Sequence, residues 1–250
     1  MKVIAINQPC YLPWRGHFAL MKAADVFVFY DDVQFTSNTS RSFSARVQLK
    51  TTQGRRWLTV PVHKSGRFGQ RIDAVEIAED GRWRARHADA VRQALREAPH
   101  AASIEPVLSM LTDRSWAHLA ELTITTTRLM AERLSVRAEL LCASTLGIGG
   151  SGSGRVLAIC QALGATRYVT GHGGLDYLDH EAFETAGIAV EYLDYDLSPY
   201  PQQHGAFEPY VTALDLLANT GPDAPAHVGA RAVPWREMLA RRAPEGDGVR

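Results

Sequence analysis

The apolar positions near the N-terminus fall into short unbroken runs. Residues 3–6 (VIAI) form one run and residues 26–30 (VFVFY) form another, with a helical spacing of apolar residues over 18–24 between them. Strands that are buried on both faces of a parallel sheet show such runs, whereas half-exposed strands alternate. This opening therefore predicts a strand, a loop, a helix and a second strand that ends in Asp31 and Asp32. The carboxyl edge of such a sheet is where ligands bind.

Alternation of apolar and polar residues begins further along the chain. Residues 46–50 (RVQLK) have the period of a half-exposed strand with a cationic face. Residues 57–62 (WLTVPV) follow after a turn, so the two segments are expected to pair as a hairpin. The hairpin would bring Arg46 and Lys50 towards the carboxyl edge of the sheet. We interpret residues 72–77 as a further short strand.

A helical period then replaces the strand-like pattern. Apolar residues recur three and four positions apart over residues 81–134, which predicts a helical insertion. Strand-like runs return afterwards, with helices between them, at residues 136–142, 168–171 and 188–193. The predicted fold is an α/β protein with a mostly parallel, doubly wound sheet, and residues 1–221 form its single domain. Residues 222–250 are rich in Pro, Ala, Gly and Arg, and we expect a loosely ordered tail with one short helix at 235–239.

Composition narrows the classes of function. The chain has 250 residues, of which 46% are hydrophobic, so a sizeable core is available. Lys plus Arg and Asp plus Glu both number 27, so no global charge favours nucleic acid or an acidic membrane. The early apolar run is too short for a signal peptide, and no apolar segment approaches the roughly 18 residues that span a bilayer. Three cysteines without a CxxC pair indicate a reducing compartment, so we expect a soluble cytoplasmic protein.

The first loop is dense in chemical groups. Gln8, Tyr11, Trp14, Arg15 and His17 supply hydrogen-bonding, stacking and titratable side chains within one short segment. His17 is placed at or just before the start of a helix, where unpaired N–H groups favour an anion. We interpret the cluster as a ligand site. The alternative is that Tyr11 and Trp14 only pack beneath the loop.

A glycine-rich loop at residues 147–155 (GIGGSGSGR) precedes a predicted helix. Its spacing is close to that of a phosphate-binding loop, but that motif requires Lys followed by Ser or Thr where this chain has Arg155 and Val156. An ATPase is therefore not indicated. Backbone N–H groups at the helix N-terminus, with Ser153 and Arg155 beside them, can still cradle an anion. The alternative is a flexible connector.

A second glycine-rich segment, residues 171–179 (GHGGLDYLD), follows a predicted strand directly. Gly171 lets the backbone approach a ligand, and His172 is a candidate general acid or base facing the same cleft as His17. Alternatively, His172 bonds a neighbouring carbonyl. The nine histidines show no metal-ligand spacing, so we expect no metal site. The sequence contains no GxSxG elbow, so a hydrolase of that type is not indicated.

Several of these segments resemble the WbqC-like protein family. The resemblance is carried by residues 8–16 (QPCYLPWRG), 24–35 (ADVFVFYDDVQF) and 57–62 (WLTVPV), and by later matches at 168–171, at Tyr177, at 200–202 (YPQ) and at 207–221. It covers roughly residues 3–221. It departs at residues 37–46, where the family commonly has an aromatic residue and an Asn-Arg pair.

Members of this family occur with O-antigen polysaccharide genes and in natural-product gene clusters. The resemblance therefore implies a biosynthetic role without specifying a reaction. A separate likeness at Arg15-Gly16-His17 is to nucleotidyltransferases of the HxGH type, although the first histidine of that motif is missing here. This likeness is an analogy at the level of the fold.

Two functional hypotheses follow from these residues. The first is a biosynthetic group transferase, nucleotidyl, acyl or aminoacyl, that acts on a small-molecule or sugar intermediate and takes an anionic or carrier-bound donor. Its candidate catalytic residues are His17, Asp31, Asp32 and His172, and its candidate substrate-binding residues are Gln8, Tyr11, Trp14, Arg46, Lys50, Ser153, Arg155, Gly171, Tyr177 and Gln202. The second hypothesis is a non-catalytic binding or scaffold subunit of a biosynthetic complex. The cofactor is left open, and a homo-oligomer is among the alternatives.

Overall fold

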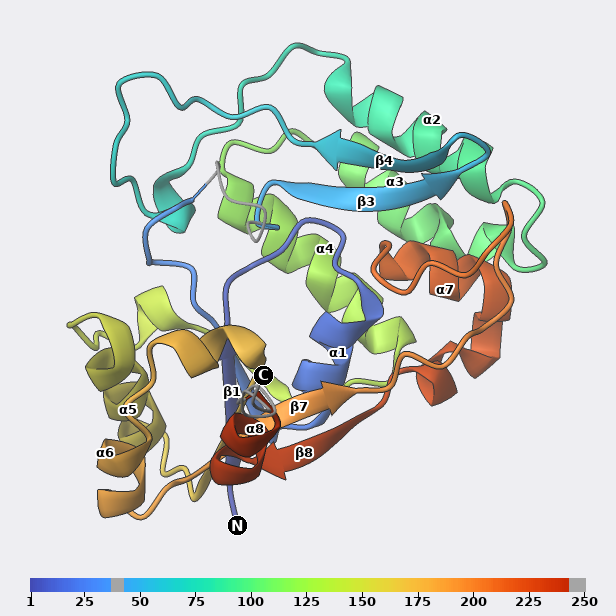
Figure 1. Cartoon of the computed structure of the whole chain (residues 1–250). Helices are drawn as coiled ribbons and strands as arrows, with labels where there is room; N and C mark the ends of the chain where they lie inside the picture. Colours follow the sequence, from blue (N-terminus) through green and yellow to red (C-terminus); the bar gives the residue numbers. More distant parts are fainter. Residues whose placement is uncertain (37–42, 243–250) are drawn as a thin grey trace, which may run out of the picture.

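The computed structural model describes residues 1–36 and 43–242. Its centre is a six-stranded sheet in the order β5-β2-β1-β6-β7-β8 (Figure 1). The bounds of these strands are β1 Val3–Asn7, β2 Val26–Phe29, β5 Glu139–Cys142, β6 Arg167–Thr170, β7 Ala189–Tyr195 and β8 Ala230–Pro234. The first five strands run parallel, and β8 is antiparallel to β7. The predicted α/β fold with a mostly parallel sheet is confirmed.

Both faces of the sheet are covered. On β1, Ala5 belongs to one hydrophobic cluster, whereas Ile4 and Ile6 belong to a second cluster on the opposite face. The first face carries α1 and the second carries α5, α6 and α8, with the bounds Arg15–Lys22, Gly152–Ala162, His180–Thr185 and Trp235–Arg242. Two buried faces explain the absence of polar alternation in these strands. The sheet is doubly wound, and its strand order reverses between β1 and β6.

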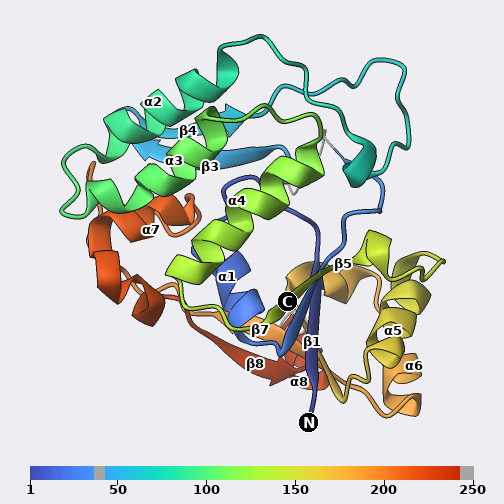
Figure 2. The same ribbon diagram turned by 180° about the vertical axis from the view of Figure 1, so that it is seen from behind.

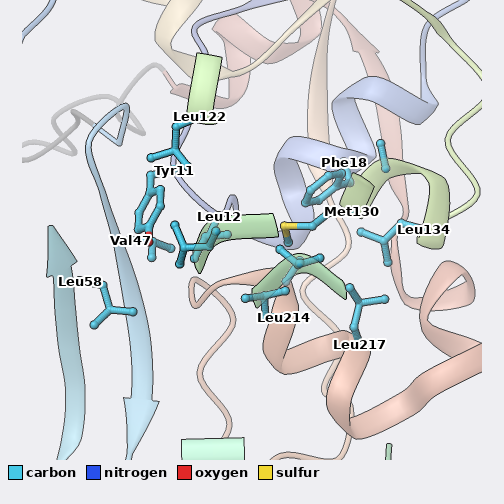
Figure 3. Close-up of a cluster of buried hydrophobic side chains, with 14 of the residues drawn as sticks. Tyr11, Leu12, Phe18, Val47, Leu58, Leu122, Met130, Leu134, Leu214 and Leu217 are labelled. Atoms are coloured by element: carbon cyan, nitrogen blue, oxygen red, sulfur yellow. The ribbon is translucent and has the colours of Figure 1, made fainter. Parts of the chain in front are cut away.

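A further layer lies beyond α1 on the first face of the sheet (Figures 1 and 2). It consists of the predicted hairpin and four helices, with the bounds β3 Arg46–Thr51, β4 Gly54–Thr59, α2 Trp83–Leu95, α3 Glu105–Thr112, α4 Leu119–Arg133 and α7 Ala213–Thr220. Figure 3 shows how Leu12 and Phe18 pack with Met130 of α4 and Leu214 of α7. One continuous hydrophobic cluster therefore joins α1, the hairpin and these helices to the sheet.

The segment at residues 72–77 differs from the predicted strand. Ile72–Ala74 is a 3-10 helix, and residues 76 and 77 form only isolated bridges. The N–H groups of residues 72 and 73 donate to the carbonyls of Val33 and Asp31 in the loop after β2. Because that loop takes these hydrogen bonds, no continuous strand ladder forms here.

The residues after 221 also differ from the expected loose tail. The 3-10 helix Gly221–His227 precedes β8, which pairs with β7, and the predicted short helix is present as α8. Val233 and Met238 belong to the second hydrophobic cluster. A short edge strand buries few side chains, so its local composition resembles that of a loop. Residues 243–250 lie outside the described residues, and none of the described helices is long and apolar enough to cross a bilayer.

Candidate functional site

A cavity of about 640 Å³ opens at the carboxyl ends of β1 and β6, where the strand order reverses. Open α/β sheets bind ligands at this position, because helices leave the sheet on opposite faces there. We name it the switch-point cavity. Its lining combines the ends of β1, β2 and β6 with the glycine-rich loop, and includes Gln8, Tyr30, Asp32, Gly150, Arg155, Gly171 and Tyr177.

The glycine-rich loop presents the N-terminus of α5 to this cavity. Gly150 and Gly152 have φ angles of +101° and +55°, which lie in the left-handed region that disfavours other side chains. No side chain caps the helix, so its first N–H groups remain available to a ligand. The hydroxyl of Ser153 accepts a hydrogen bond from the Asp179 N–H at 2.8 Å, and Ser153 does not line the cavity.

An ion pair joins this helix to the end of β2. The Arg155 Nη2 atom lies 2.5 Å from Oδ2 of Asp32, and Arg155 Nε donates to the Ile148 carbonyl at 2.9 Å. Only 7% of the Arg155 side chain and 10% of the Asp32 side chain are exposed. The hydrogen bond to Asp32 raises the pKa of Arg155, so the guanidinium stays charged. The Arg155 guanidinium also lies over the Tyr30 ring, 5.1 Å from its centroid.

A second cavity of about 470 Å³ adjoins the first and shares Asn7 and Gln8 with it. We name it the aromatic cavity. Its lining includes Tyr11, Trp14, His17, Phe43, Arg46, Arg55, Trp57 and Tyr210. Phe43, Trp57 and Tyr210 are exposed. Exposed aromatic side chains that gather around one hollow are typical of a binding site, because each exposed ring retains apolar area that a ligand can bury.

Trp14 closes one side of the aromatic cavity. Its ring lies 5.0 Å from that of Tyr195 and 5.3 Å from that of Tyr210, centroid to centroid. A Cβ atom on Gly16 would lie 2.2 Å from the Trp14 ring. Glycine at position 16 therefore lets the indole cross the start of α1 and reach the two tyrosines.

His17 lies within the first turn of α1 and is 3% exposed. Its Nδ1 atom is 3.5 Å from Nδ2 of Asn7, and its ring meets the edges of Phe18 and Phe27. Burial lowers the pKa of His17 to about 4. His17 is consequently neutral at neutral pH.

The folded protein is expected to lose stability as the pH falls from about 6.5 towards 4. Burial gives both His17 and His87 a folded-state pKa of about 4, against about 6.5 in an unfolded chain. Between these values the unfolded chain binds more protons, so each histidine removes about 3 kcal/mol from the free energy of unfolding across this window. Urea unfolding at a series of pH values measures the loss.

A matched pair of variants tests whether the buried histidines cause this pH dependence. His87→Asn is expected to remove the contribution of one buried histidine, so the free energy of unfolding should fall less steeply with pH. Gln53→Asn, at an exposed residue that carries no titratable group, should leave the slope unchanged. A wild-type free energy of unfolding that stays level between pH 7 and pH 4.5 would contradict the argument.

Several predicted residues line neither cavity. Asp31 accepts hydrogen bonds from the N–H of Ser144 at 3.0 Å and from its hydroxyl at 2.6 Å, and so holds the turn after β5. Lys50 donates to the side-chain oxygen of Gln202 at 3.0 Å inside the protein. His172 lines a different cavity of about 520 Å³, together with Asp176 and Arg241.

Nine of the fourteen predicted site residues are thus divided between two neighbouring cavities. Gln8, Asp32, Arg155, Gly171 and Tyr177 line the switch-point cavity, and Gln8, Tyr11, Trp14, His17 and Arg46 line the aromatic cavity. Tyr11 also bonds the His87 ring nitrogen through its hydroxyl at 2.9 Å, which fixes it in the wall.

Several lining residues were not predicted from the sequence, among them Asn7, Tyr30, Trp57 and Tyr210. Asn7 and Tyr30 could have been found, because both are polar side chains at the carboxyl end of a buried strand. Trp57 and Tyr210 had no comparable local signal. In the part of the chain that the structure describes, no three His, Cys, Asp or Glu side chains are grouped so as to hold a metal ion.

The fold and the two adjoining cavities define a doubly wound α/β protein with a candidate ligand crevice at its switch point. The chain belongs to the WbqC-like protein family, whose model matches residues 8–227. It is also similar to Rv1507c of Mycobacterium tuberculosis, which is described as an uncharacterized protein, with 36% identity over 228 residues that cover 90% of this chain and 96% of the relative. No solved structure matches the chain.

Proposed function

We propose that the protein is a group transferase that binds a donor in the switch-point cavity and an acceptor in the aromatic cavity. The observation that carries this proposal is that two cavities of different chemistry meet at Asn7 and Gln8. A transfer reaction requires two substrates whose reacting atoms lie about 3 Å apart, which a shared wall permits. The family resemblance supports a place in natural-product or surface-polysaccharide biosynthesis.

The switch-point cavity suits an anionic donor. The uncapped N-terminus of α5 offers N–H groups, and the positive end of the helix dipole points the same way. The charged guanidinium of Arg155 lies in the first turn of that helix. A nucleotidyl, acyl-phosphate or aminoacyl-adenylate donor would present its phosphate to these groups.

The aromatic cavity suits an acceptor with a flat apolar portion. Rings of Trp14, Trp57 and Tyr210 can stack on such a group. Among the described residues that line this cavity, Arg46 and Arg55 are cationic and none is acidic. An acceptor that carries a carboxylate is therefore favoured over one that carries a second positive charge.

His17 is the proposed general base. It lines the aromatic cavity and lies against Asn7, which belongs to both cavities. Its lowered pKa keeps the imidazole unprotonated at neutral pH, but it also makes His17 a weaker base than an exposed histidine. His17 takes the proton from an acceptor amine or hydroxyl as that group attacks the donor and displaces pyrophosphate, phosphate or AMP from it. Asp31, the other candidate for this role, is already engaged by Ser144.

The proposal is tested by measuring whether two ligands bind at once. Melting temperatures are recorded with a panel of donors (nucleotides, nucleotide sugars, acyl phosphates and aminoacyl-adenylate analogues) and with aromatic carboxylic and amino acids as acceptors. A donor and an acceptor at about 100 times their Kd each stabilise the protein by about 2.7 kcal/mol, and we expect these gains to be additive. Mass spectrometry of the mixture then detects the transferred group.

Variants separate the two cavities in this experiment. Trp57→Ala is expected to weaken acceptor binding at least tenfold through loss of a stacking ring, about 1.4 kcal/mol, without changing donor binding. Phe68→Ala, at a fully exposed aromatic residue outside both cavities, is the control. Competition between every donor and every acceptor for one site would contradict the proposal and favour a non-catalytic binding subunit.

A further inference from the structure

One oxygen of Asp32 has no partner in the described structure. Oδ2 of this carboxylate is held by Arg155, but Oδ1 is buried without a hydrogen-bond donor. The Asp32 side chain is 10% exposed and lines the switch-point cavity. A buried acceptor that stays unpaired costs free energy, and more so when it is charged. A ligand hydroxyl that donates to Oδ1 would recover that cost.

This oxygen lies beside the anion cradle of the same cavity. Arg155, which holds Oδ2, is in the first turn of α5, and the uncapped N–H groups of that turn are in the cavity wall. The 11-residue helix is long enough to have a substantial dipole. The cavity therefore offers a hydroxyl acceptor and a phosphate site side by side.

Two tyrosines complete the wall. Tyr30 and Tyr177 both line the cavity, and Tyr177 is 50% exposed. Tyrosine rings present flat apolar faces against which a sugar ring or a base can pack. In doubly wound nucleotide-binding proteins, a carboxylate at the end of the second strand accepts a hydrogen bond from a ribose hydroxyl, and Asp32 follows the end of β2.

We propose that the switch-point cavity recognises a phosphorylated sugar, with a ring hydroxyl donating to Asp32 Oδ1 and the phosphate at the N-terminus of α5. This inference rests on the donor cavity of the proposed function and names its substrate class. The sugar phosphate can be the ribose phosphate of a nucleotide or a hexose 1-phosphate, because both present the same pair of groups.

The test is a thermodynamic cycle that combines a change in the ligand with a substitution in the protein, with each affinity measured by isothermal titration calorimetry. The probes are adenosine 5′-monophosphate against its 2′,3′-dideoxy analogue, and glucose 1-phosphate against its deoxygenated analogues, such as 2-deoxyglucose 1-phosphate. In the wild type, removal of the hydroxyls is expected to weaken binding about 10- to 100-fold, as for loss of a hydrogen bond to a charged group. In Asp32→Ala the same removal should have little effect, because its partner is gone.

Asp73→Ala is the matched control, since Asp73 also pairs with an arginine near this edge but does not line the cavity. If Asp32→Ala fails to fold, Asp32→Asn gives the same comparison. The hydroxyls should then still contribute part of their effect on affinity, because the amide oxygen can accept a hydrogen bond but carries no charge. The hydroxylated probe that binds the wild type more tightly, the nucleotide or the hexose phosphate, identifies the source of the sugar. Hydroxylated and deoxygenated probes that bind the wild type equally, or no binding of any probe at millimolar concentration, overturn the inference.

This outcome is separable from failure of the proposed function. If acyl phosphates bind without hydroxyl dependence and transfer still occurs, the transferase stands and the sugar is excluded. If sugar phosphates show the coupling to Asp32 but no acceptor binds beside them, the sugar site stands and the transferase is excluded.

Discussion

Replacement of His17 by asparagine is expected to lower the rate of group transfer by about 10²-fold, the lower end of the range that a positioned general base supplies, because the lowered pKa makes His17 a weak base. The imidazole is 3% exposed, adjoins Asn7 at the junction of the two cavities, and is unprotonated at neutral pH. Asparagine keeps a polar group of similar reach but cannot accept the proton. The donor bound in the other cavity should keep its affinity, so the loss should appear in kcat.

His87→Asn is the control that matches this change in burial. Burial also lowers the pKa of His87 to about 4, but His87 bonds the Tyr11 hydroxyl and lines neither of the two cavities. Its variant should lose stability and keep most of kcat, and any effect transmitted through Tyr11 should appear in the KM of the acceptor. A folded His17→Asn protein that transfers the group at the wild-type rate would remove His17 from the mechanism.

Lys50→Met is expected to lower the free energy of unfolding by about 3–5 kcal/mol, the usual cost of breaking a buried charged network. The side chain is 2% exposed and donates to the Gln202 side chain at 3.0 Å and to the Gly205 carbonyl at 3.3 Å. Its charge also opposes the rise that burial causes in the pKa of Asp215. Without the ammonium, these acceptors remain buried with fewer partners. Urea unfolding at pH 7 measures the change.

Lys64→Met provides the comparison, because this lysine is exposed and its loss should change stability by no more than about 0.5 kcal/mol. The double variant Lys50→Met with Asp215→Asn should be more stable than the sum of the two single changes predicts, since the opposing charge is removed as well. If Lys50→Met is as stable as the wild type while ligand affinity drops, Lys50 belongs to the binding site after all.

The relation between pattern and structure is clearest at the two ends of the chain. The unbroken apolar runs of β1 and β2 predicted parallel strands with both faces covered, and their polar ends do meet at the switch point. The region after residue 221 gave no such signal. Its strand lies at the sheet edge and pairs only with β7, so few of its positions had to be apolar.

The candidate site shows the same limit. Local pattern identified Gln8, Asp32 and Arg155, because strand ends and a glycine-rich helix start are recognisable in the residues themselves. It did not reveal that the predicted residues divide into two cavities on either side of Asn7. That division depends on the position of the hairpin relative to the sheet. The hairpin is held in part by the hydrogen bond that the Thr212 N–H donates to the carbonyl of Gln48.

Residue order alone was sufficient for the fold class, the edge of the sheet where chemistry gathers and the family. Tertiary packing alone decided the direction in which the cations face: Lys50 turns inward to Gln202, 152 positions away, whereas Arg46 lies over Trp57 in the aromatic cavity. The physical reason is the distance along the chain over which each effect acts. Hydrophobic period reports the burial of a face within one element, but the partner of a charged side chain is chosen by contacts between elements that are distant in the chain.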